Sequence, residues 1–167
     1  MKKLIKPLLM VSIMAAAFTA QAVQKDITVN ASVDASMDLT QSDNTPLPSS
    51  IIMQYLPGKG LTPFSLNTKV WSNSATIGVN VRLVKAASLA DANGAKSIPL
   101  TVSLGGTVLT ATNQTLAAAT LFPAGITNGS DILPLRITQT TQSILETGTY
   151  SGIVSLIVTQ ATTAPGS

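Results

Sequence analysis

The residues that could do chemistry are few in this chain, and their spacing does not suit catalysis. The sequence contains no histidine and no cysteine, which excludes Ser-His and Cys-His nucleophilic pairs and imidazole or thiolate metal ligands. Asp34 and Asp38 share a parity, but on an extended strand they would lie about 13 Å apart, beyond the roughly 5–9.5 Å that separates glycosidase carboxylates. Gly58-Lys59-Gly60 lacks the flanking residues of a phosphate-binding loop and indicates a turn. The sequence therefore predicts a protein that is not an enzyme, with no catalytic residues, cofactor or metal site.

The most regular element of the sequence is the stretch 23–39, VQKDITVNASVDASMDL. Its odd positions are apolar except for Lys25, and its even positions are polar, which is the period of a strand with one dry face. At about 3.3 Å per residue it could reach roughly 55 Å, far beyond the usual strand of five or six residues. Two interpretations follow: a strand that lies in another molecule, or the first strand of a complete sandwich.

The residues before this stretch have the three parts of a secretory signal peptide. Three lysines occur within the first six residues, an apolar run covers Leu8–Phe18, and Ala20-Gln21-Ala22 matches an A-x-A cleavage site. A membrane anchor is the alternative, but a bilayer span needs about 20 apolar residues, roughly twice this run. The sequence predicts a signal peptide over residues 1–22, with cleavage between Ala22 and Val23.

Removal of the signal changes the charge of the chain. The full sequence has ten Lys and Arg against seven Asp and Glu, and Lys2, Lys3 and Lys6 lie in the signal. The mature chain therefore carries equal numbers of both signs. No basic stripe remains that could neutralise phosphates, so the sequence predicts no nucleic-acid partner.

The remainder, about 145 residues, is long enough for one domain with one core. Apolar residues alternate in short runs between Gly, Pro, Asn and Asp turns, while residues 113–121 are expected to form a loop with at most one helical turn. About seven or eight strands at this spacing favour an all-β sandwich of the immunoglobulin kind. The expected strands are 51–56, 64–71, 77–83, 98–104, 107–112, 132–137 and 150–158.

Both ends of the mature chain also resemble a known family. The stretch 23–39 directly after a signal peptide, with TYSGIVSLIVT near the C-terminus, resembles the major pilins of the class 5 (alpha) chaperone–usher fimbriae. That family includes the colonization factor antigen I group and the cable pili. The resemblance implies an incomplete immunoglobulin-like β-sandwich that lacks its last strand and is completed by a donor strand from a neighbouring subunit. It divides the mature chain into a donor-strand extension, 23–35, and one pilin domain, 36–167.

The resemblance also implies roles for residues at both ends. The donor residues would be Val23, Ile27, Val29, Ala31 and Val33. The edge of the acceptor groove would include Tyr150, Val154, Leu156 and Val158.

The partners implied by the resemblance are identical subunits, a periplasmic chaperone and an outer-membrane usher. A tip adhesin and host surface receptors are further candidates. The protein would pass through the periplasm to a cell-surface fimbrium and serve there as the major structural subunit, supporting adhesion. The alternative from another class is a monomeric secreted β-sandwich that binds a ligand, either lectin-like or adhesin-like. Trp71 suits either hypothesis, because it could stack on a sugar or pack at the end of a sheet.

Overall fold

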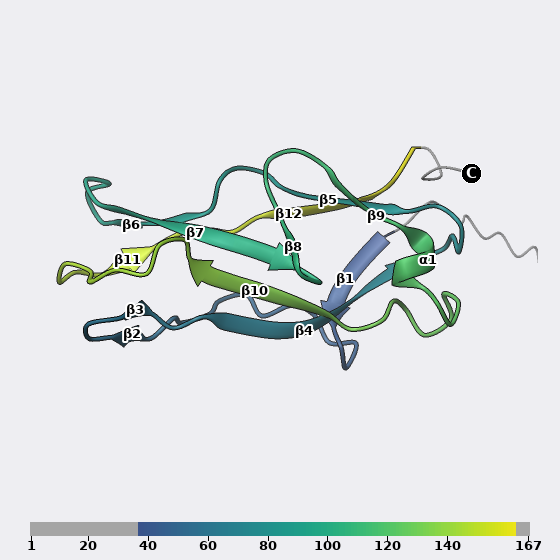
Figure 1. Cartoon of the computed structure of the whole chain (residues 1–167), viewed down its shortest axis with the longest axis horizontal. Helices are drawn as coiled ribbons and strands as arrows, with labels where there is room; N and C mark the ends of the chain where they lie inside the picture. The colour runs from purple at the N-terminus through teal and green to yellow at the C-terminus, as the bar shows by residue number, and fades with distance from the viewer. Residues whose placement is uncertain (1–36, 163–167) are drawn as a thin grey trace, which may run out of the picture. The chain divides into compact units, whose positions relative to one another are not determined.

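The computed structural model describes residues 37–162, which form two antiparallel sheets, a separate two-stranded hairpin and one helical turn. The larger sheet has seven strands, in the spatial order β1-β4-β10-β7-β6-β11 with β8 paired to β7 (Figure 1). In chain order these strands are β1 (Met37–Gln41), β4 (Phe64–Ser72), β6 (Ser88–Asp91), β7 (Ser97–Leu104), β8 (Thr107–Val108), β10 (Leu133–Gln139) and β11 (Tyr150–Ser151). Every pairing described is antiparallel, as expected for strands with one dry face.

The smaller sheet has three strands in the order β12-β5-β9, and a separate two-stranded hairpin projects near one end of β4 (Figure 1). The sheet consists of β5 (Val79–Leu83), β9 (Gln114–Leu116) and β12 (Leu156–Gln160), and the hairpin of β2 (Tyr55–Leu56) and β3 (Gly60–Leu61). The helical turn α1 (Ala118–Leu121) follows β9. In residues 37–162 there is no helix long and apolar enough to span a bilayer.

The core lies between the two sheets and is built from the alternating strands. Val79 and Val81 of β5 face Val102 and Leu104 of β7 across it, and all four are at most 1% exposed. Every second residue of each strand is therefore buried, as the alternating sequence pattern predicts, because successive side chains of a strand point to opposite faces. The alternation therefore places both sheets on one shared core.

Trp71, at the end of β4, is part of the packing. Its indole Nε1 donates a hydrogen bond to Thr40 Oγ1 at 2.9 Å. Its ring covers Gly129, where an added Cβ would come within 3.2 Å of the ring atoms. These contacts account for a half-buried tryptophan at a sheet end without a sugar ligand.

Several expected elements differ in the structure. Only Tyr55–Leu56 of the expected strand 51–56 is a strand, because the residues before it have no ladder partner. The expected strand 107–112 ends at Val108. Residues 113–121 contain β9 in addition to the helical turn, since tertiary pairing with β5 extends this short segment.

The expected strand 150–158 is also wrong as a single element. The structure divides it into β11, paired with β6 of the larger sheet, and β12, paired with β5 of the smaller one. The chain changes partner at Gly152, where an added Cβ would lie 2.1 Å from the carbonyl oxygen of Ser88. Only glycine permits this close approach of two backbones.

This contact predicts that Gly152→Ala lowers the free energy of unfolding by about 1–3 kcal/mol, because the new methyl group pushes the crossing away from β6. Denaturant unfolding of the exported full chain measures the change. Gly148→Ala is the matched control: its Cβ would meet the Tyr150 ring at an ordinary 3.4 Å, and it shares the loss of unfolded-state entropy. Equal denaturation midpoints for the two variants would show that the close approach of Gly152 to Ser88 does not require glycine.

Candidate functional site

An apolar groove of about 710 Å³ is open along one side of the sandwich. Its floor comes from the larger sheet: Phe64 and Leu66 of β4, and Leu135 and Ile137 of β10. The register places Leu135 opposite Leu66 and Ile137 opposite Phe64, so the four side chains form two neighbouring cross-strand pairs. Phe64 and Leu66 remain half-buried. The floor is thus core-like in composition but incompletely covered.

The first wall of the groove is the segment from Leu47 to Met53. Ile51 and Met53 turn toward the core and are half-buried, whereas Ile52 between them is 90% exposed. The backbone therefore keeps the alternation of a strand without being in one. Within the described residues, the N–H and C=O groups of this segment make no hydrogen bond. Pairing begins only at Gln54, whose carbonyl accepts from Thr62 N at 2.8 Å.

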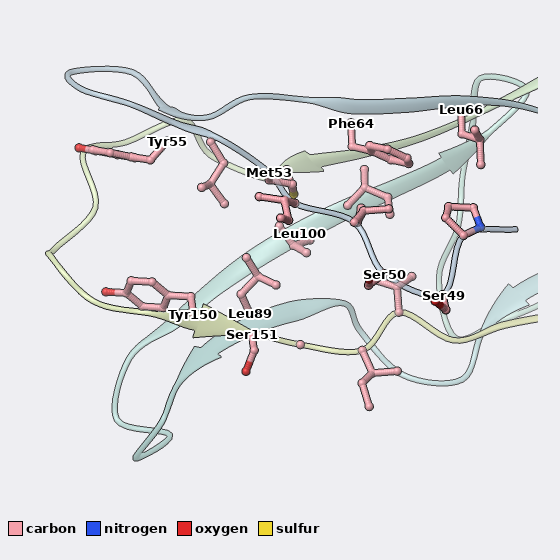
Figure 2. Close-up of a pocket in the computed structure, with 18 of the residues that line it drawn as sticks. Ser49, Ser50, Met53, Tyr55, Phe64, Leu66, Leu89, Leu100, Tyr150 and Ser151 are labelled. Atoms are coloured by element: carbon pink, nitrogen blue, oxygen red, sulfur yellow. The ribbon is translucent and has the colours of Figure 1, made fainter.

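The second wall is the crossing between β11 and β12. Figure 2 shows Tyr150 on this wall and Tyr55 on the opposite side, both at the same end of the groove. Gly152, Ile153 and Val154 lie in the wall, and their backbone groups have no hydrogen bond within the described part of the chain. Two backbone edges thus face each other across an apolar floor.

The structure brings most of the expected acceptor residues together. Tyr150, Val154 and Leu156 line the second wall and are half-buried. Val158 packs against the core further along β12 and does not line the groove. The expected donor residues Val23, Ile27, Val29, Ala31 and Val33 lie outside the described residues, as do the expected cleavage positions Ala22 and Val23.

The first wall and the floor are site residues that the sequence analysis did not assign. One sequence pattern could have indicated the first wall. Ile51 and Met53 are two positions apart, so they share one face of an extended segment between a proline-containing loop and the hairpin turn. Nothing in the local pattern separates the floor residues from the rest of the core. The floor residues are exposed only because no strand covers them, and a local sequence pattern does not show which strand is missing.

Polar contacts hold the second wall in place. The Tyr150 hydroxyl donates to the carbonyl oxygen of Glu146 at 3.0 Å, and the Glu146 carboxylate pairs with the Lys96 ammonium in the turn between β6 and β7. This hydrogen-bonded ion pair raises the pKa of Lys96 above its ordinary value of 10.5. In residues 37–162 there is no group of three or more His, Cys, Asp or Glu that could hold a metal ion.

The raised pKa predicts a pH dependence. Because the folded state binds the Lys96 proton more tightly, the contribution of the pair is fully present below the unfolded pKa and is lost as pH rises through the folded value. The gap in melting temperature between the wild type and Lys96→Met should narrow as pH rises above about 10.5. It should stay small throughout, since both side chains are exposed. Thermal melts across that range test this; a gap that widens would contradict it.

Comparison with known proteins places this chain in a family. The model of the CS1 type fimbrial major subunit matches residues 23–159. A CFA/I fimbrial subunit of Escherichia coli is 37% identical over 150 residues, covering 86% of this chain and 88% of the relative. A CS1 fimbrial subunit of Escherichia coli is 35% identical over 151 residues, with the same coverage.

The fold agrees with the sequence comparison. The structure of the CooA pilin subunit from enterotoxigenic Escherichia coli superposes with a TM-score of 0.67 and 31% identity, over 75% of this chain and 88% of that one. These findings confirm the expected immunoglobulin-like β-sandwich of a pilin and the expected class of protein. They decide against the monomeric binding module. The chain therefore belongs to the family of CS1 type fimbrial major subunits and is a structural subunit of a cell-surface fimbria.

Proposed function

We propose that this subunit polymerises by donor-strand exchange, with residues 23–35 of one copy occupying the groove of the next. The observation that carries the proposal is the groove itself: two unpaired backbone edges face each other over an apolar floor. An added strand satisfies both edges at once, and its inward side chains cover the floor. The odd face of the extension, with Val23, Ile27, Val29, Ala31 and Val33, supplies those side chains.

The same groove explains the assembly route that we propose. Before assembly the open edges would invite aggregation, so a periplasmic chaperone covers them with a strand of its own, and exchange follows at an outer-membrane usher. The signal peptide, residues 1–22, directs export and is removed between Ala22 and Val23. The mature chain then consists of a donor extension, 23–35, and one pilin domain, 36–167.

The proposal also explains why assembly yields a filament. The donor strand and the groove are different surfaces of one chain, so their contact is heterologous and leaves a free groove and a free strand at the two ends. Identical subunits can therefore add without limit. A filament of identical copies would also gain avidity from weak contacts of the shaft with host surfaces.

Deletion of residues 23–35 tests the proposal. The exported full-length protein should form ladders that resist SDS at room temperature and collapse on boiling, because donor-strand polymers dissociate slowly. The deletion variant should stay monomeric and should melt at higher temperature when a Val23–Ala35 peptide is added. Two stable monomers with similar melting temperatures would contradict the proposal, and a stable full-length monomer alone would indicate insertion into its own groove.

The two faces of the extension provide a matched pair of substitutions. Val29→Asp places a charge among the floor residues, and each buried apolar side chain contributes about 1.5–3 kcal/mol, so the variant should lose most of its polymer. Asn30→Asp places the same charge on the polar face and should polymerise nearly as well as the wild type. The fraction of polymer on unboiled SDS gels measures both. Equal losses would show that the odd face is not the inserted one.

A further inference from the structure

A second feature of the molecule is a hollow of about 490 Å³ where β1 begins, lined by Met37, Asp38, Trp71, Ser72 and Asn73. We call it the Met37 hollow. It lies at the Ser72 end of β4, whereas Phe64 at the other end of β4 lies in the groove. Eight residues of strand, about 26 Å, separate these two positions. The Met37 hollow and the Tyr55–Tyr150 end of the groove are therefore at opposite ends of β4 (Figure 1).

Chain length limits where the next subunit can sit. This step rests on the proposed donor-strand exchange. Val33 is the last donor residue, and only three residues separate it from Met37. A chain of this length spans at most about 14 Å. The Met37 hollow of the incoming copy must therefore lie close to the point at which its donor strand leaves the groove.

The incoming domain should sit at the end of the groove away from Leu156. At the Leu156 end, β1 of the same subunit lies beside β12, so an incoming domain would have to pass this strand. At the other end, Tyr55 and Tyr150 border an open mouth (Figure 2). The donor strand should therefore leave between the two tyrosines. In that direction it runs antiparallel to the second wall, which leads from Tyr150 into β12, and parallel to the first wall, which leads toward Tyr55.

The β2–β3 hairpin stands at this mouth. Tyr55 pairs with Leu61 and Leu56 with Gly60, so the tip presents Leu56, 43% exposed, and Lys59. Within residues 37–162, the Lys59 ammonium makes no hydrogen bond or ion pair. The tip is thus an apolar side chain next to a free positive charge.

The Met37 hollow has complementary chemistry. Asp38 is exposed and uses one carboxylate oxygen to accept a hydrogen bond from Leu39 N at 2.8 Å. Trp71 and Met37 are half-buried, and the bond from the indole to Thr40 holds the tryptophan ring in place. Tryptophan and methionine are enriched at protein interfaces, and a pre-positioned ring loses little entropy on binding.

We infer that the β2–β3 hairpin of one subunit docks into the Met37 hollow of the subunit whose donor strand it holds. Lys59 pairs with Asp38 of the incoming copy, and Leu56 packs against its Met37 and Trp71. The contact sets the angle between successive subunits, which a three-residue connection alone leaves free. It is a second interface between copies of this chain, separate from the groove.

Cross-linking between introduced cysteines tests the contact. Because the chain contains no cysteine of its own, only the introduced residues can react. Asp38→Cys with Lys59→Cys in the full chain, assembled into fimbriae and treated with a short bis-maleimide, should give ladders that survive boiling. Asp38→Cys with Thr112→Cys is the matched control, because Thr112 is exposed in the connection between β8 and β9, away from the hairpin. Ladders for the first pair alone support the inference.

The outcomes separate this inference from the proposed function. Polymer that dissociates on boiling and gives no cross-link overturns the inference and leaves donor-strand exchange standing. Wild-type chain that forms no polymer overturns both.

If the cysteine variants fail to assemble, reversal of the Asp38 and Lys59 charges tests the contact instead. Asp38→Lys or Lys59→Glu alone should speed dissociation of the polymer in SDS by about two- to fivefold, the range for an exposed pair. The two together should restore the wild-type rate. Wild-type rates for all three variants would overturn the inference.

Discussion

The requirement that backbone hydrogen-bonding groups be paired is the constraint on which this structure depends. A sandwich buries its apolar floor by covering it with a strand, and that strand also satisfies the edges beside it. Here the floor of Phe64, Leu66, Leu135 and Ile137 is present and both edges are in position, while the backbone of the Leu47–Met53 wall is unpaired in the described part of the chain. The subunit therefore has a stable core and a surface that is complete only with another strand.

The rest of the fold positions that surface. The larger sheet supplies the floor through the register of β4 and β10, and β11 anchors one end of the second wall to β6. Gly152 allows the chain to pass closely over Ser88 and continue into β12 on the other sheet. The Lys96–Glu146 pair and the Tyr150 hydroxyl then hold the loop that leads into this wall. These contacts therefore connect the second wall to the larger sheet.

The parts of the fold that could be predicted from the sequence are those in which one local pattern decides the outcome. In β5 and β7, alternating residues are buried because each strand has one dry face, and the pattern is visible without knowledge of the partners. The Gly, Asn and Asp turn signals are equally local: in the turn between β6 and β7, Gly94 N donates to Asp91 O at 3.0 Å. The division of residues 150–158 could not be predicted, because it depends on two partner strands in different sheets. Likewise, Ile51 and Met53 have the parity of a strand, but only the missing neighbour decides whether one forms.

Amide hydrogen exchange at the first wall shows whether a donor strand pairs with its backbone, since exchange reports whether each N–H is hydrogen-bonded. It should be measured on the chain lacking residues 23–35, with and without the Val23–Ala35 peptide, and on assembled fimbriae. We expect the amides of Ser49–Met53 to exchange rapidly without the donor and to become protected with it, whereas the amides of β7 should be protected in all three samples. Unchanged exchange at Ser49–Met53 when the donor strand is supplied would contradict completion of the groove by that strand.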